Sequence, residues 1–413
     1  MAKWMKAARM AALLGAAMIS LPLTGASQAQ SSTPATPPAA NAATSTADLP
    51  RDGNALFWTT PQRDAAFRAM EQILPFHTVR AGSNFHILAD GAPMNPRWNA
   101  DGRDWDLASF MADQRLAGII VLHHGRVVLE QYGLGFGREG RWTSFSVAKS
   151  FTSTLVGAAL RDGAISSLED PVTRYIPELA GSGYDGVSVR QLLTMTSGVR
   201  WNEDYTSPTS DVARFFFQQP EGGLDPVTAY MRHLPREVAP GTRWQYNTGE
   251  TNLIGVLVER ATGKTLAEYL SAKVWVPYGM GGDAYWTLNA GGHEVSGCCL
   301  SMTLRDYARF GQFVLDDGVA GGQRVVPDGW FDAAGHKQAD IGRPGFGYGY
   351  QWWTMDDGAF AAQGIFGQGI FIDRARGLVI AGVGNYEHAT DPVMARHRQA
   401  FYMAVRAAVD AAH

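Results

Sequence analysis

The chain has 413 residues, of which 35 are Lys or Arg and 39 are Asp or Glu, so its formal net charge is −4. Because the charges nearly balance and no long basic run occurs, we expect no nucleic-acid partner. The length is sufficient for two lobes, or for one large domain with an insertion.

Residues 1–29 have the pattern of a secretory signal peptide. A basic start with Lys3 and Lys6 precedes an apolar run over 10–23. The small residues Ser27 and Ala29 then flank Gln28. This pattern predicts cleavage after Ala29. The apolar run is too short and too interrupted for a stable membrane anchor. We therefore expect a periplasmic or secreted protein.

Residues 30–50 are rich in Ala, Ser, Thr and Pro. A segment with so few large apolar groups cannot bury enough surface to fold, so it is predicted to be a disordered linker.

The only two cysteines, Cys298 and Cys299, are adjacent. Neighbouring cysteines cannot join distant parts of a fold, so we expect them to be small packing residues. They also exclude a cysteine-based zinc site, and no His-Glu-x-x-His motif replaces it. We expect neither a metal nor an organic cofactor.

Two hairpins are predicted far apart in the chain. Residues 116–132 contain β-branched runs on both sides of His124-Gly125, and residues 369–383 contain a second pair of apolar runs. A helix with an apolar face is predicted over 393–411. Together these elements predict one antiparallel sheet, flanked by helices and assembled from both ends of the chain.

Helix and loop signals dominate residues 163–290, including short helical runs at 189–195 and 253–260. The predicted fold class is therefore α/β (α+β). A mostly helical lobe formed by 163–290 would be inserted into an α/β lobe formed by 51–162 and 291–413.

Ser146 and Lys149 are three positions apart at the expected start of a helix that ends near Asp162. Both side chains would project from one face of that helix. A serine hydroxyl needs a base to become a nucleophile, and a lysine can be that base when burial destabilises its ammonium. The backbone N–H of Ser146 would form half of an oxyanion hole. However, about one Ser-x-x-Lys match is expected by chance in a chain this rich in serine.

Tyr246 follows a Pro-Gly turn and precedes a predicted helix in the inserted segment. On such a loop its phenol would relay a proton between Ser146, Lys149 and a leaving group. For a tyrosine taken alone, packing of the ring with an exposed hydroxyl is the commoner arrangement.

Three segments in order resemble the serine β-lactamase/penicillin-binding superfamily. They are Ser146-x-x-Lys149, Tyr246 with Gly255 nine positions later, and residues 297–311. The chain is most similar to the class C-like branch, which includes esterases and 6-aminohexanoate-oligomer hydrolases, and the resemblance spans about residues 55–410. It implies a β-lactamase-like fold and a small-molecule amide or ester substrate. It also implies an acyl-enzyme on Ser146, with Lys149 and Tyr246 moving the proton.

A further segment of the family pattern, usually Lys-Thr-Gly on the strand beside the nucleophile, is altered in this chain. The corresponding residues are Ala362, Gln363 and Gly364, so the strand and its glycine are kept and the cation is lost. The resemblance implies that the N–H of Ile365 is the second oxyanion donor, beside Gly364 at the substrate-binding edge. A neutral, apolar-sided pocket favours esters or short linear amides. A β-lactamase or DD-carboxypeptidase, and a non-catalytic penicillin-binding envelope domain, are the alternatives.

Two further residues are candidates for substrate binding. Tyr205 lies where the amidase branch has a tyrosine that contacts the scissile amide nitrogen, and Trp352 is a candidate for the wall of the acyl pocket. The alternatives are a loop aromatic for Tyr205 and a core residue for Trp352. The sequence predicts no oligomeric state.

Overall fold

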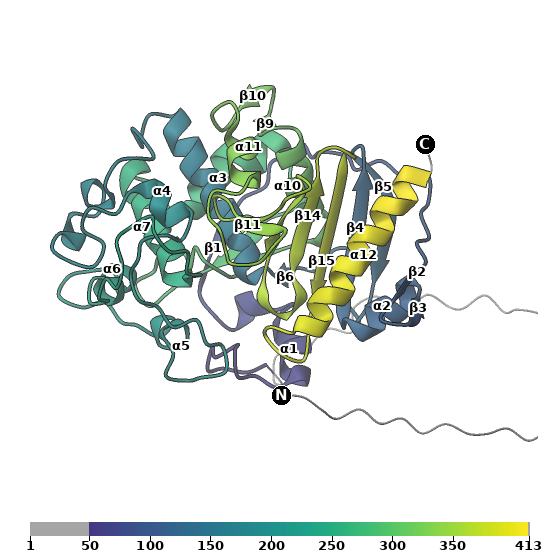
Figure 1. Ribbon diagram of the computed structural model, residues 1–413, viewed down its shortest axis with the longest axis horizontal. Coiled ribbons are helices and arrows are strands. Elements are labelled where there is room, and N and C mark those ends of the chain that lie inside the picture. Colours follow the sequence, from purple (N-terminus) through teal and green to yellow (C-terminus); the bar gives the residue numbers. More distant parts are fainter. Residues whose placement is uncertain (1–48, 412–413) are drawn as a thin grey trace, which may run out of the picture. The chain divides into compact units, whose positions relative to one another are not determined.

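A seven-stranded antiparallel sheet, assembled from both ends of the chain, is the centre of the computed structural model (Figure 1). The strand order is β11-β12-β13-β14-β15-β4-β5. The bounds are Phe346–Tyr348 (β11), Trp353–Met355 (β12), Phe360–Gln363 (β13), Gly369–Asp373 (β14), Leu378–Gly384 (β15), Leu116–His123 (β4) and Arg126–Tyr132 (β5). Strand β15 pairs with β4, so the two predicted hairpins lie side by side and the predicted antiparallel sheet is confirmed.

The first hairpin turns tightly at the predicted position. His124 and Gly125 have φ values of 48° and 73°. Two consecutive left-handed residues are what a two-residue hairpin turn requires, because they match the right-handed twist of the strands. Glycine adopts this conformation without strain.

The structure describes residues 49–411. The predicted signal peptide and residues 30–48 of the predicted linker lie outside the described residues. The last two linker positions, Leu49 and Pro50, are buried, and Leu49 packs into the core. These two residues therefore belong to the folded part and not to a linker.

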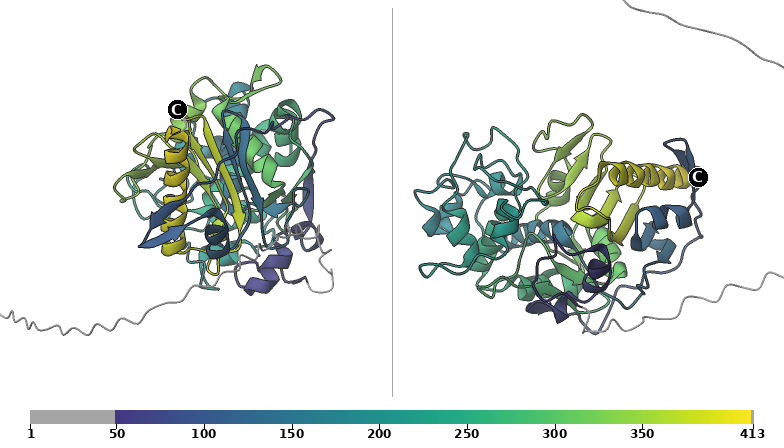
Figure 2. Two further views of the ribbon diagram at one scale, coloured as in Figure 1. Left: turned by 90° about the vertical axis from the view of Figure 1, so that its right-hand side faces the viewer. Right: turned by 90° about the horizontal axis from the view of Figure 1, so that it is seen from below.

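Helices cover both faces of the large sheet (Figure 2). On one face lie α2 (Leu107–Asp113) and α12 (Pro392–Ala411), where Phe371 of β14 stacks on Tyr402 with ring centroids 4.5 Å apart. On the other face lie α10 (Leu304–Leu315) and, behind it, α3 (Ala148–Arg161). The preceding strand residue, Ile370, packs in the core on that side. This alternation along β14 fills both cores with residues of one strand.

A second sheet has the order β1-β7-β8-β6. Its strands are Phe76–Val79 (β1), Ala284–Thr287 (β7), Leu300–Met302 (β8) and Trp142–Thr143 (β6). Two ribbons complete the strands: β2 (Trp98–Ala100) with β3 (Arg103–Trp105), and β9 (Val319–Ala320) with β10 (Gln323–Arg324). Strand β6 ends just before the segment that carries Ser146.

Residues 163–290 are mostly helix and loop, with strand β7 near their end. The helices are α4 (Val189–Leu193), α5 (Asp211–Phe215), α6 (Pro226–Met231), α7 (Thr248–Thr262), α8 (Leu266–Leu270) and α9 (Val276–Tyr278), with a π-helical turn at Ser271–Trp275. Helices α1 (Thr60–Ala66) and α11 (Trp330–Gly335) lie elsewhere in the chain. The described residues all fall within one compact unit, and the division into two lobes stays a prediction.

None of the helices between residues 49 and 411 combines the length and the apolar character needed to cross a membrane.

Candidate active site

Ser146 lies in a 3₁₀ turn, Phe145–Val147, that leads directly into α3. The α-helix proper begins at Ala148, two residues later than the position of Ser146. Phe145 has a φ of 43°, an unusual conformation for a residue with a side chain. Packing between Phe67 and Phe366, with centroids 4.9 and 5.3 Å away, holds Phe145 in this conformation. The backbone before Ser146 is thus fixed by aromatic packing.

Lys149 projects from the first turn of α3 and is 1 % exposed. Its Nζ donates to Ser146 Oγ at 3.0 Å, to Thr248 Oγ1 at 3.1 Å and to the carbonyl oxygen of Gly297 at 2.7 Å. Burial lowers the pKa of Lys149 to about 8, although the charge of Glu203 opposes this. Roughly a tenth of the amine is therefore neutral at pH 7, and this fraction can accept the serine proton.

Tyr246 lies two residues before the start of α7 at Thr248. Its ring stacks on Trp353, with centroids 5.5 Å apart, and its centroid is 5.2 Å from Lys149 Nζ. Burial raises the pKa of the Tyr246 phenol far above its usual value, the charge of Glu203 adds to this, and a hydrogen bond with Ser146 acts against it. The phenol therefore stays protonated and is available as a proton donor. The structure brings Ser146, Lys149 and Tyr246 together from separate stretches of the chain.

Glu203 organises the residues behind Lys149, a role that the sequence did not indicate. It accepts hydrogen bonds from the Thr248 hydroxyl at 2.5 Å, the Thr248 N–H at 3.0 Å, the Tyr205 hydroxyl at 2.7 Å and the Trp201 indole N–H. The hydroxyl of Thr248 accepts from Lys149 and donates to Glu203. The chain of contacts thus runs from Ser146 through Lys149 and Thr248 to a carboxylate.

Gly364 and Ile365 form the edge of the site opposite Ser146. A side-chain carbon on Gly364 would lie 2.6 Å from the carbonyl oxygen of Ser144, so only glycine permits this close approach. Ile365 begins a 3₁₀ turn immediately after β13 and lines the same cavities as Ser146. The first N–H groups of a helical turn lack partners within the turn, which suits both amides to bind an oxyanion. This role of Ile365 stays a prediction.

Two cavities meet at Ser146. The larger has a volume of about 540 Å³ and includes Glu203, Tyr205, Tyr246 and Trp353 in its wall. The smaller has a volume of about 80 Å³, and aromatic and aliphatic side chains such as those of Phe215, Phe216 and Val295 make up most of its wall. Tyr205 lines both cavities, as expected for a residue near the substrate. A small-molecule substrate would therefore meet one compartment with a mixed polar and apolar wall and one that is mostly apolar.

Trp352 lies in the core, and the cavity wall carries its neighbour Trp353 instead. Trp352 is 0 % exposed and stacks on Phe310 of α10, with centroids 6.3 Å apart. Consecutive residues at the start of a strand point in opposite directions, so only one of the two tryptophans can face the cavity. The expectation for Trp352 is therefore corrected to Trp353.

Cys298 and Cys299 are bonded to each other, whereas we expected separate packing residues. Cys299 has a φ of 72°, which brings the two neighbouring side chains together. Both line the smaller cavity and follow Gly297, whose carbonyl oxygen accepts from Lys149. The disulfide therefore forms part of the wall beside the site. Among residues 49–411, no group of three or more metal-ligating side chains occurs.

Residues 106–403 match the protein-family model described as Beta-lactamase. A 6-aminohexanoate-dimer hydrolase from Paenarthrobacter ureafaciens is 34% identical over 296 residues, which are 68% of this chain and 75% of that protein. Esterase EstB from Burkholderia gladioli is 27% identical over 363 residues, covering 71% of this chain and 92% of the esterase.

A solved structure shares the fold. The putative 6-aminohexanoate-dimer hydrolase from Bacillus anthracis superposes with a TM-score of 0.75 at 22% identity, covering 86% of this chain and 98% of that one. A family VIII carboxylesterase superposes with a TM-score of 0.56 at 20% identity, covering 72% and 95% of the two chains. Both have the same arrangement of sheet and helices.

Proposed function

Because the chain belongs to the β-lactamase family and is a serine hydrolase of the amidase and esterase type, we propose that Ser146 is its nucleophile and Lys149 its base. The observation that carries this proposal is the 3.0 Å contact between Lys149 Nζ and Ser146 Oγ, made by an amine whose pKa burial lowers to about 8. A lysine with its usual pKa would be almost fully protonated at neutral pH, so it could not accept the proton of serine.

Acylation follows from these contacts. Ser146 Oγ bonds to the carbonyl carbon of the substrate while Lys149 takes the hydroxyl proton. The carbonyl oxygen becomes an oxyanion held by the N–H groups of Ser146 and Ile365. Tyr246 donates its proton to the leaving nitrogen or oxygen as the bond to carbon breaks, and the ammonium of Lys149 returns a proton to Tyr246.

Deacylation uses the same groups in reverse. A water molecule attacks the acyl carbon, its proton passes to Lys149 by way of Tyr246, and the bond to Ser146 Oγ breaks. Oγ recovers a proton from Lys149, and the free acid leaves. Glu203 has a positioning role in this sequence: its four hydrogen bonds hold Thr248, Tyr205 and Trp201 beside the reacting atoms.

We infer a substrate of small size with a linear amide or ester bond. The cavity of about 540 Å³ lies within the range of small-molecule sites. One relative is named for hydrolysis of a 6-aminohexanoate dimer and another is named an esterase. The Ala362–Gly364 segment lacks the lysine of β-lactamases and DD-peptidases, which favours linear substrates over β-lactams. The predicted signal peptide supports action in the periplasm or outside the cell.

Intact-mass measurement after treatment with a fluorophosphonate tests the nucleophile. We expect one adduct on the wild-type protein and none on Ser146→Ala. An unlabelled wild-type protein would support a non-catalytic binding domain. Steady-state assays with nitrocefin, a p-nitrophenyl ester and a linear amide then separate the reaction classes. Fast nitrocefin turnover with negligible cleavage of the other two substrates would instead identify a β-lactamase.

A further inference from the structure

The two cavities that meet at Ser146 differ in their relation to Tyr246. Tyr246 lies in the wall of the larger cavity, whereas the wall of the smaller cavity does not include it. In the proposed mechanism Tyr246 protonates the leaving group, so the leaving group must lie on the Tyr246 side of Ser146. The acyl chain extends from the opposite side of the same carbonyl carbon. Of the two cavities, the smaller one is therefore left for the acyl chain.

The wall of the smaller cavity is uncharged. None of the described residues that line it is Asp, Glu, Lys, Arg or His. Most of the wall comes from residues 53–56 before α1, residues 212–217 of α5 and the turn after it, and residues 295–299 before β8. Arg214 belongs to the second segment, but its side chain is exposed and lies outside the wall. An ammonium in this cavity would lose water without gaining a carboxylate, which is unfavourable.

The polar side chains beside Ser146 already have hydrogen-bond partners. The hydroxyl groups of Tyr205 and Thr248 both donate to Glu203. Asn252 Nδ2 donates to the carbonyl oxygen of Thr248 at 2.9 Å. An acyl chain in the smaller cavity therefore binds mainly through contact with apolar surface.

The Cys298–Cys299 disulfide keeps one part of this wall neutral. Both residues line the cavity, and their bonded sulfurs cannot ionise, whereas a free thiol can lose its proton. The backbone holds the disulfide in place. The N–H of Cys298 donates to the carbonyl oxygen of Val295 at 3.0 Å, and the carbonyl oxygen of Cys299 accepts from the N–H of Thr287 at 3.1 Å. The disulfide thus offers a fixed, uncharged surface beside Ser146.

Apolar side chains continue from this cavity to the surface. Phe217 lines the cavity and is 46% exposed. Phe57 follows the wall residue Leu56 and is 41% exposed. Exposed apolar surface that is continuous with a cavity is typical of a site for an apolar ligand.

We propose that the smaller cavity binds the acyl chain of the substrate, and that the enzyme prefers uncharged, apolar acyl groups to acyl chains that end in an ammonium. This inference rests on the proposed function. It assigns α5 and the Cys298–Cys299 disulfide to recognition of the acyl group. The larger cavity, whose wall includes charged residues such as Glu203 and Asp391, then receives the leaving group.

The first test varies the acyl chain of p-nitrophenyl esters at pH 8. Burial of each methylene group favours binding about fourfold, so we expect kcat/KM to rise about tenfold from the acetate to the butyrate. The hexanoate and the 6-aminohexanoate have acyl chains of equal length and differ by one ammonium. We expect kcat/KM to be about tenfold or more higher for the hexanoate. Equal values for these two esters, or no rise from acetate to butyrate, would overturn the proposal.

The second test places a carboxylate in the wall. Val212 lies in the first turn of α5, where a carboxylate is favoured by the helix dipole. Val212→Asp and Val212→Asn differ only in charge. We expect the preference for hexanoate over 6-aminohexanoate to be about tenfold lower in Val212→Asp than in Val212→Asn. The same preference in both variants would contradict the assignment of this cavity to the acyl chain.

Thermal unfolding of every variant detects loss of folding. If a Val212 variant does not fold, Phe217→Asp and Phe217→Asn provide the same comparison at a half-exposed position of the same wall. A pair of acetates with the charge on the leaving group, 4-(aminomethyl)phenyl acetate and 4-methylphenyl acetate, is the control. Val212→Asp and Val212→Asn should give the same ratio of kcat/KM for this pair. A change in this ratio, with none for the acyl pair, would show that the two cavities have been assigned in the wrong order.

A binding measurement separates this inference from the proposed function. Calorimetric titration of Ser146→Ala with hexanamide and with 6-aminohexanamide needs no catalysis. We expect hexanamide to bind more tightly, and Val212→Asp in the same background to reduce the difference. If the wild type hydrolyses none of the esters while this difference is present, the proposed function is wrong and the apolar site stands. If hydrolysis occurs and 6-aminohexanamide binds as tightly as hexanamide, the proposed acyl site is wrong.

Discussion

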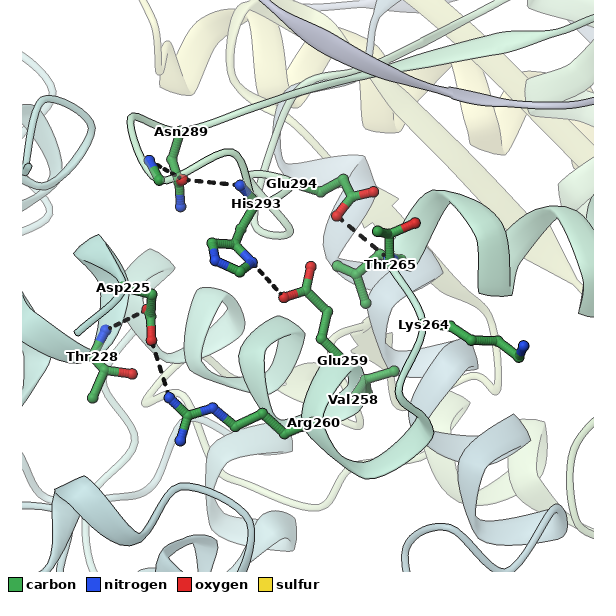
Figure 3. Close-up of polar contacts among 12 residues, drawn as sticks. Asp225, Thr228, Val258, Glu259, Arg260, Lys264, Thr265, Asn289, His293 and Glu294 are labelled. Carbon is green, nitrogen blue, oxygen red and sulfur yellow. Dashed lines mark hydrogen bonds and ion pairs between the residues drawn. The ribbon is translucent and has the colours of Figure 1, made fainter. Parts of the chain in front are cut away.

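A buried ionisable group lies at each end of helix α7, and the two groups differ in their partners. At the N-terminal end, Lys149 is separated from the carboxylate of Glu203 by the hydroxyl of Thr248. At the C-terminal end, Glu259 contacts His293 directly, with 2.8 Å between Oε2 and Nδ1 (Figure 3). At the N-terminal end one hydroxyl group separates Lys149 from Glu203, whereas at the C-terminal end Glu259 and His293 are in direct contact.

The pKa shifts follow from this difference. Burial lowers the pKa of Lys149 to about 8, with only partial opposition from Glu203. Burial also raises the pKa of Glu259, but the hydrogen bond from His293 acts in the opposite direction. Neighbouring Glu294 is stabilised as a carboxylate, because hydrogen bonds from its surroundings outweigh burial and lower its pKa. Burial thus shifts the pKa at both ends of α7, because it lowers that of Lys149 to about 8 and raises that of Glu259 to about 7. The hydrogen bond from His293 reduces the shift of Glu259 without cancelling it.

Removal of the buried amine should have the largest effect. Lys149→Ala takes away the only base within hydrogen-bonding distance of Ser146 Oγ in the described part of the chain. We expect kcat for a p-nitrophenyl ester to fall on the order of a thousandfold, as for loss of a general base. Circular dichroism should show a folded protein. A rate near that of the wild type would remove Lys149 from the mechanism.

Tyr246→Phe should have the next largest effect, and it should depend on the leaving group. The ring keeps its stacking on Trp353, and only the hydroxyl is lost. We expect kcat to fall on the order of a hundredfold for a linear amide, whose nitrogen must be protonated to leave. The loss should be smaller for a p-nitrophenyl ester, because nitrophenolate leaves without a proton. Equal losses for both substrates would contradict the role of Tyr246 as the acid.

Glu203→Gln should shift the pH dependence of kcat/KM, because it removes the carboxylate nearest to Lys149 at the N-terminal end of α7. As the proposed base, Lys149 must be neutral to accept a proton, so we expect activity to be lost as pH falls through its pKa of about 8. Because the charge of Glu203 raises that pKa, its removal should move the acid limb of the kcat/KM profile to lower pH. Asp204→Asn, an exposed neighbour, is the control and should leave the profile unchanged. An acid limb that stays in place in Glu203→Gln would show that this charge does not reach Lys149.

The paired end should affect stability only weakly. The hydrogen bond with Glu259 raises the pKa of His293 above its ordinary value of 6.5. A raised histidine pKa gives stability that is fully present below the unfolded pKa and is lost as pH rises through the folded pKa. The side chain of His293 is 42% exposed, so we expect an effect of about 1 kcal/mol or less.

The measurement is the Tm of wild type and His293→Asn between pH 5 and pH 9. The advantage of the wild type should shrink as the pH rises. A constant difference across this range would show that the charge of His293 contributes nothing to stability.

Local patterns in the sequence were sufficient for the framework of the site. The hairpin at His124-Gly125, the helix after Ser146 and the C-terminal helix each depend on residues close together in the chain, and all three occur in the structure. The juxtaposition of Ser146, Lys149 and Tyr246 came from the resemblance to a known family. Local patterns alone left Tyr246 with two readings.

Contacts between distant residues were not accessible from the sequence. Glu203 and Thr248 are 45 positions apart, and no periodicity links them. Gln363 and Arg398 come from a strand and a helix whose relative placement depends on the packed sheet. The choice between Trp352 and Trp353 depended on the starting position of a three-residue strand. A shift of one residue in the predicted start of this strand exchanges the residue that faces the core with the one that faces the cavity.

The central position of β15 in the large sheet has a consequence for biosynthesis. Strand β13, which directly precedes Gly364, reaches the first hairpin only through β14 and β15 (Leu378–Gly384). A ribosome that has not yet released these residues holds a polypeptide whose Ser146 still lacks the opposite edge of its site. We therefore expect that a nascent polypeptide does not act on esters or amides until β15 has been synthesised and has paired with β4.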